Sequence, residues 1–130
     1  MDLKVGIIGS ADILVSEENT AKTMGSGSLD VFATPAMIAL MEKAASIAVQ
    51  NYIDEDSSTV GTMINVKHMA ATPIGLNVTA RAELVEVDGK RLVFNVEAFD
   101  EKGKIGEGQH ERFIINAQRF ISKAKSKLNE

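Results

Sequence analysis

The stretch VFATPAMIALMEKAASIAVQ, residues 31–50, decides the fold. Its Thr-Pro pair is typical of a helix start, with Thr34 as the N-cap and Pro35 as the first helical residue, because proline lacks an N–H that would have no partner there. The rest of the stretch is apolar on almost every side, which predicts a buried helix. The carboxylate of Glu42 is costly in such a helix unless another group pairs with it or uses it.

Strand patterns flank this helix. Residues 3–15 predict a first strand or two short ones, and GSGSLD at 25–30 is typical of a flexible connector. After the helix, TVGTMINVKHM at 59–69 alternates with period two, which predicts a strand. One face of that strand is expected to carry Val60, Thr62, Ile64, Val66 and His68.

Three more strands complete an antiparallel meander of three or four strands. LNVTARAELVEV alternates until the Leu84-Val85 pair, which indicates a bulge. Asp88-Gly89 predicts a two-residue hairpin turn before RLVFNVEAF, and IGEGQHERFII follows. NAQRFISKAKSKLNE predicts a short C-terminal helix. The predicted class is α+β, with a sheet around one long central helix, and a homodimer is expected to cover the apolar surface that remains.

Length and composition limit the function. The 130 residues predict a single domain, 1–130. The net charge of −4, without a stretch rich in both basic and aromatic residues, argues against a nucleic-acid partner. The chain has no cysteine, which excludes thiolate chemistry and fits a cytoplasmic protein. No signal peptide and no apolar run of about 20 residues is present, so no membrane partner is expected, and no metal-ligand spacing was found.

Two histidines and a central acid are the only candidates for acid-base chemistry. Eight residues of helix rise about 12 Å, and the Glu42 side chain leans back toward the helix start, so His68 could bridge Thr34 and Glu42. The N–H groups of Ala36 and Met37 would be available to an oxyanion. A purely structural role stays open for each residue. Thr34 would cap the helix, Glu42 would belong to a solvent-facing stripe of polar residues on the helix, and His68 would be a core histidine that is hydrogen-bonded to a neighbour.

Four segments in this order and spacing, ATPAMIALME, VGTMINVKHMAATPIG, EVDGKRLVFNVEAFDE and IGEGQHERFII, resemble the hot-dog-fold thioesterases of the fluoroacetyl-CoA thioesterase type. The resemblance implies a dimer that hydrolyses an acyl-CoA thioester to a free acid and coenzyme A. No cofactor is implied, since coenzyme A is part of the substrate. The catalytic residues of the family fall on Thr34, Glu42 and His68, with Glu42 and His68 as the acid-base pair. Thr34 would either orient water or act as the nucleophile.

The resemblance also suggests residues that contact the substrate. Gly61 matches a position where the backbone lies close to the acyl group, although an ordinary strand glycine or a bulge explains it equally well. Arg112 matches a position that would meet coenzyme A phosphates or an acid at the dimer seam, with His110 in the same network. The fluoroacetyl-specific family member closes its pocket with a hydrophobic lid, where this chain has GSGS followed by few apolar residues, among them Phe32. A short-chain or medium-chain acyl group is therefore expected rather than fluoroacetyl.

Other functions fit less well. A non-catalytic acyl-CoA-binding module would be stabilised by ligand without releasing a thiol, and the intact Thr34, Glu42 and His68 argue against it. A hot-dog dehydratase needs a hydratase segment that was not found. The GIIG sequence lacks the glycine spacing of a nucleotide fingerprint.

Overall fold

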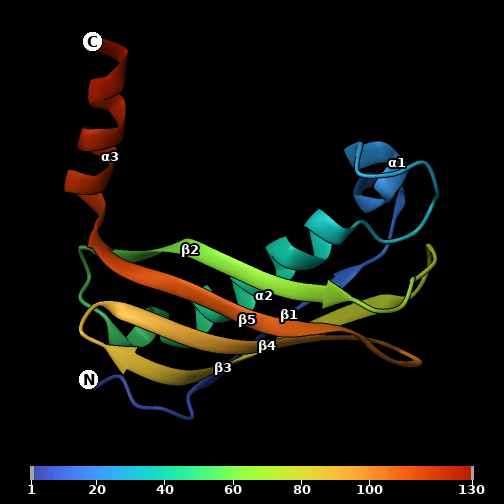
Figure 1. Ribbon diagram of the computed structural model, residues 1–130, viewed down its shortest axis with the longest axis horizontal. Helices are drawn as coiled ribbons and strands as arrows, with labels where there is room; N and C mark the ends of the chain where they lie inside the picture. Colours follow the sequence, from blue (N-terminus) through green and yellow to red (C-terminus); the bar gives the residue numbers. More distant parts are fainter. Residues whose placement is uncertain (1, 130) are drawn as a thin grey trace.

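One antiparallel sheet wraps around a long helix, α2 (Thr34–Val49), in the computed structural model, which describes residues 2–129 (Figure 1). The five strands lie in the order β1-β3-β4-β5-β2, so β1 and β2 form the edges. In chain order they span Ile8–Leu14, Ser57–His68, Asn77–Asp88, Arg91–Asp100 and Gly103–Asn116. The other helices are α1 (Ala21–Met24) and α3 (Ala117–Lys125), with 3-10 turns at Glu17–Asn19, Gln50–Tyr52 and Ser126–Asn129.

The core lies between α2 and the concave face of the sheet. Small residues on both sides let the helix lie close to the strands, and Gly9 on β1 is the tightest point. A Cβ on Gly9 would meet the Ala44 carbonyl oxygen and would lie 2.7 Å from the Ala48 nitrogen. Eight residues of α2 are buried: Ala36, Met37, Leu40, Met41, Ala44, Ala45, Ala48 and Val49.

The α+β prediction is confirmed, and the antiparallel meander is confirmed for β3, β4 and β5, whereas β2 pairs with β5 and not with β3. The register of β3 against β4 shifts between Leu84 and Glu86, which confirms the predicted bulge. The hairpin turn lies one residue later than predicted, because Asp88 still pairs with Arg91 and the loop is Gly89-Lys90. Gly89 comes first in this loop with φ of 61°, a left-handed conformation that glycine adopts without strain.

The start of α2 differs from the prediction by one residue. Ala33 is the N-cap, no side chain caps the helix, and Thr34 is already helical. Its hydroxyl is therefore available to a residue outside the helix. The chain between β1 and α2 also forms short helical turns that the sequence analysis did not predict, held by the Ser16 and Thr20 side chains at their starts.

A bulge in β2 changes which of its side chains face α2. The register against β5 shifts between Gly61 and Met63, which inserts one residue into the alternation. Ile64, Val66 and His68 share a face as predicted, but the grouping of Val60 with them is wrong. Val60 pairs with Phe113, on the outer face of β5, whereas Gly61 pairs with the buried Arg112 and shares the inner face.

No helix within residues 2–129 is both long and apolar enough to cross a membrane.

Candidate active site

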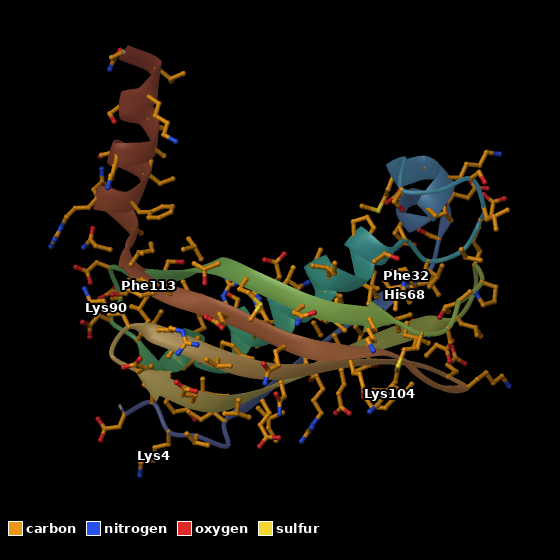
Figure 2. The ribbon with its side chains drawn as sticks, in the orientation of Figure 1. Lys4, Phe32, His68, Lys90, Lys104 and Phe113 are labelled. Atoms are coloured by element: carbon orange, nitrogen blue, oxygen red, sulfur yellow. The ribbon has the colours of Figure 1, made fainter. Side chains whose placement is uncertain are left out.

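Thr34 and His68 meet at the start of α2. The Thr34 hydroxyl oxygen lies 2.8 Å from His68 Nδ1, a hydrogen bond between the first helical residue and the last residue of β2. Figure 2 shows His68 beside Phe32 at this end of the molecule. A hydroxyl in hydrogen-bond contact with an imidazole is the arrangement of an activated nucleophile or of a water-orienting pair.

The environment of His68 keeps its ring neutral. Burial lowers the pKa of His68 below its ordinary value of 6.5, because desolvation disfavours the charged form, and the nearby Ala70 backbone opposes this effect. Its second nitrogen, Nε2, is enclosed and makes no hydrogen bond within residues 2–129. Enclosed polar atoms normally have partners, so Nε2 is left unsatisfied by the residues that the structure describes.

A pocket of about 260 Å³ opens beside this pair. Phe32, which was expected to contact substrate, is buried in its wall. Most of the other side chains are small, which leaves room beside the hydroxyl. The lining residues are Ala21, Ser26, Val31, Phe32, Thr34, His68, Met69, Ala70 and Ala71.

Glu42 lies in a different pocket, two turns along α2. Its side chain is 43% exposed, and Oε2 lies 3.8 Å from Arg112 Nη1. This smaller pocket, about 210 Å³, is lined by residues of β2 and by His110: Glu42, Gly61, Thr62, Met63, Ile64 and His110. The predicted bridge from Thr34 through His68 to Glu42 thus forms at its Thr34 end only, since neither pocket contains both His68 and Glu42.

Arg112 anchors a buried network behind Glu42. Its side chain is only 9% exposed, and its Nε and Nη2 donate to the hydroxyl and carbonyl oxygens of Thr59, both at 2.9 Å. Nη1 lies 3.1 Å from His110 Nε2, and burial lowers the pKa of Arg112 while the Glu42 carboxylate opposes this effect. These bonds favour an ion-pair role, at Glu42, over direct contact with coenzyme A phosphates.

The bond to Arg112 fixes the tautomer of His110. A guanidinium can only donate, so His110 Nε2 accepts, and Nδ1–H donates to the Met63 carbonyl at 2.8 Å. Burial lowers the pKa of His110, the Met63 carbonyl opposes this, and the Arg112 charge adds to the lowering. His110 is therefore a neutral ring that holds the bulged part of β2 in place.

Gly61 lies directly under the Glu42 carboxylate. A Cβ on Gly61 would come 2.6 Å from Glu42 Oε2 and 3.1 Å from His110 Cε1. The absence of a side chain therefore makes room for Glu42 to lie against β2. In this chain, the group that lies close to the Gly61 backbone is the Glu42 carboxylate.

One of the two backbone N–H groups that were expected to bind an oxyanion already has a partner. The Met37 N–H donates to the Ala33 carbonyl at 3.0 Å, so it is not free for an oxyanion as the sequence analysis expected. The Ala36 N–H makes no hydrogen bond within residues 2–129 and remains the donor at the helix start.

Thr59 and the Met69–Ala71 wall of the larger pocket are functional features that the sequence did not predict. Thr59 binds Arg112 across two strands, and no local pattern marks it because the contact depends on the register of β2 against β5. A weak signal exists for the wall, since the small residues Ala70 and Ala71 follow His68 closely.

Comparison with known proteins identifies the chain. Residues 15–118 match the family model of fluoroacetyl-CoA-specific thioesterases. The fluoroacetyl-CoA thioesterase of Streptantibioticus cattleyicolor is 45% identical over 98 residues, which are 75% of this chain and 70% of that protein. A solved structure of the fluoroacetyl-CoA thioesterase FlK superposes with a TM-score of 0.91 at 37% identity, covering 98% of each chain. A hot-dog-like protein from Thermanaerovibrio acidaminovorans, 22% identical, shares the fold with a TM-score of 0.84, covering 95% of this chain and 91% of its own.

The fold and the site define a hot-dog protein, with a curled antiparallel sheet around a central helix, and a thioester hydrolase. More narrowly, the chain belongs to the fluoroacetyl-CoA-specific thioesterase family. The hydrolysis of a thioester to a free acid and coenzyme A is thus its class of reaction.

Proposed function

We propose that the chain, as a single domain of residues 1–130, hydrolyses acyl-CoA thioesters as a homodimer with shared active sites. In each site one subunit supplies Thr34 and His68, and the other supplies Glu42. The observation that carries this proposal is the separation within one chain: the Thr34–His68 hydrogen bond lies in one pocket and the Glu42 carboxylate in another.

The free edge of β2 supports a dimer. This strand has 12 residues and pairs only with β5, so its other edge offers unpaired backbone groups along its length. Ile64 on the same strand is exposed. A second β2 strand, related by a two-fold axis, would pair antiparallel with this edge.

Such a pairing brings the two half-sites together. Because of the bulge, Gly61 and His68 each lie three ladder positions from Asn65, so a two-fold axis at Asn65 sets His68 opposite the partner subunit's Gly61. Because Glu42 lies directly over Gly61, the partner subunit's Glu42 then faces the Thr34–His68 pair. The carboxylate would supply the acidic group that His68 lacks within its own chain.

The chemistry follows from these contacts. Thr34 Oγ attacks the thioester carbonyl carbon while His68 takes its proton, and the Ala36 N–H donates to the developing oxyanion. The C–S bond then breaks, and His68 returns the proton to the departing thiolate of coenzyme A. The partner subunit's Glu42 takes a proton from water, which attacks the acyl carbon of the ester on Thr34. The C–O bond to Thr34 breaks, Glu42 returns the proton to Thr34 Oγ, and the free acid leaves.

The pocket supports a short-chain or medium-chain acyl group. Its volume of about 260 Å³ and its small lining residues leave space beyond a two-carbon unit, and residues 25–28 in front of it are exposed glycines and serines. Solved variants of the related thioesterase hold acetyl-CoA, or fluoroacetate and coenzyme A, which supports a coenzyme A ester as the substrate here.

The test is release of free thiol from a panel of acyl-CoAs, fluoroacetyl-CoA included. Glu42→Ala and His68→Ala should each lower the rate by about a hundredfold or more while circular dichroism shows an unchanged fold. Thr34→Val should abolish an acyl adduct that mass spectrometry detects on the native protein. Full turnover in both Glu42→Ala and His68→Ala would contradict the proposal, and turnover without any acyl adduct would show direct attack by water.

A further inference from the structure

Helix α3 projects away from the rest of its own chain. It rises from the end of β5, on the side of the free edge of β2, and α1 rises on the same side at the opposite end (Figure 1). None of its residues is buried. A nine-residue helix that contacts its own chain only at its base is marginal in water, so a helix here implies further packing along its length.

The helix has the face that such packing needs. Ala117, Phe120, Ile121 and Ala124 repeat at helical spacing, and Phe120 and Ile121 are 41% and 50% exposed. The opposite face carries polar residues such as Ser122. A groove of about 250 Å³ between this helix and β5 is lined by Phe113, Ile115 and Phe120. Figure 2 places Phe113 at the base of the helix.

The β2 pairing proposed above determines what lies next to this face. The base of α3 is tied to the start of β2, since the Ala117 N–H donates to the Asp56 carbonyl at 3.1 Å. In the proposed dimer, the register directs the chain that leaves the partner subunit's β2 after His68 toward Ser57. The segment that follows β2 in the second copy, residues 69–74, therefore lies beside α3.

That segment complements the helix. It exposes two large apolar side chains, Met69 at 48% and Ile74 at 44%. It also lies against the segment before α2, because the Phe32 N–H donates to the Thr72 carbonyl at 2.8 Å. Residues 16–31 there carry three acids and one lysine, whereas residues 117–129 carry four cations and no acid. The charges of the two surfaces are opposite in sign, which favours their contact.

We propose that α3 is an intersubunit arm whose apolar face, formed mainly by Phe120 and Ile121, packs on residues 69–74 of a second copy. Met69, Ala70 and Ala71 line the Thr34–His68 pocket, so the arm braces the wall of the partner's acyl site. This proposal rests on the proposed dimer and adds a second contact to it.

Cross-linking tests the arm directly, because the chain has no cysteine of its own. The double variant Phe120→Cys with Ile74→Cys is treated with a short bifunctional maleimide and run on a denaturing gel. The matched control is Ser122→Cys with Ile74→Cys, which places the thiol on the opposite face of the helix. Sedimentation of each untreated variant measures the dimer independently.

We expect most of the Phe120→Cys pair to become covalent dimer, with at least a fivefold lower yield from the Ser122→Cys pair. A sedimenting dimer that cross-links equally poorly in both pairs would overturn the arm and leave the shared active site standing. A monomer in sedimentation would overturn both proposals. Phe120→Ser, compared with Ser122→Ala, should also raise the dimer dissociation constant by about tenfold, and no difference between them would contradict the arm.

Discussion

The two half-sites of this chain are built in opposite ways. The Thr34–His68 pair consists of one hydrogen bond at a helix start, beside an open pocket, with one imidazole nitrogen left without a partner among the described residues. The Glu42 site rests on a buried scaffold in which Arg112 binds Thr59 and His110. The first half-site has reactive groups and little support, and the second has one reactive group and extensive support. In the proposed dimer, each half-site would complete the other across the two subunits.

The largest effect is expected from a methyl group under Glu42. In Gly61→Ala the new Cβ would come 2.6 Å from Glu42 Oε2, and the flexible carboxylate must move away. We expect a loss of about a hundredfold in kcat/KM with little change in thermal stability. A thiol-release assay and a melting curve measure the two quantities. An unchanged rate would show that the position of Glu42 over Gly61 is not the catalytic one.

A glycine-to-alanine substitution on β1 should instead lower the stability and leave the rate almost unchanged. In Gly9→Ala the Cβ meets the α2 backbone at Ala44 and Ala48, which cannot move aside as a side chain can. We expect unfolding free energy to fall by about 2 kcal/mol or more, measured by denaturant titration. The turnover of the folded fraction should stay within about twofold of the native rate. If Gly61→Ala and Gly9→Ala lowered the rate equally, the proposed difference between the active site and the core would not hold.

Arg112→Lys tests the support behind Glu42. Lysine keeps the charge, but its single ammonium group cannot donate to the two oxygens of Thr59 and to the ring nitrogen of His110 at the same time. We expect a loss of about 1.5 kcal/mol in stability and about tenfold in kcat, with a KM near the native value. A raised KM with native kcat would instead indicate direct contact with coenzyme A. Thr59→Val should show a smaller loss of the same kind.

The smallest effect concerns pH. Burial lowers the pKa of both His68 and His110 below the ordinary 6.5, so the folded protein binds these protons less readily than the unfolded chain. Their contribution to stability is complete above about pH 6.5 and is lost as the pH falls toward the folded pKa values. Activity that needs neutral His68 should decline with a midpoint below 6.5. A midpoint above 6.5 would contradict a desolvated, neutral ring.

Much of the fold follows from local pattern. The central helix shows in the apolar run after Thr34-Pro35, and the bulge shows in the broken alternation at Leu84-Val85, because each depends on neighbouring residues only. The bulge at Gly61 was one of the alternatives that the sequence left open. Its position depends on how β2 pairs with β5, and the two strands are about 50 residues apart in sequence.

The candidate site was predictable in its members and less so in its arrangement. Thr34, Glu42 and His68 were named from a helix start, a charged residue in an apolar helix, and a strand end. The contact of Thr34 with His68 matched the expected reach, but Glu42 lies against Gly61 and Arg112 instead of His68. Sequence spacing along one helix cannot show which face of the sheet each side chain meets.

The most direct measurement is activity in mixed dimers. Glu42→Ala and His68→Ala proteins are unfolded together and refolded so that subunits exchange, and thiol release is compared with that of each variant alone. A shared site predicts recovery to about a quarter of the native rate, because half of the dimers are mixed and each has one intact site. If mixing leaves the rate at the level of the single variants while sedimentation shows mixed dimers, the two half-sites do not combine across subunits.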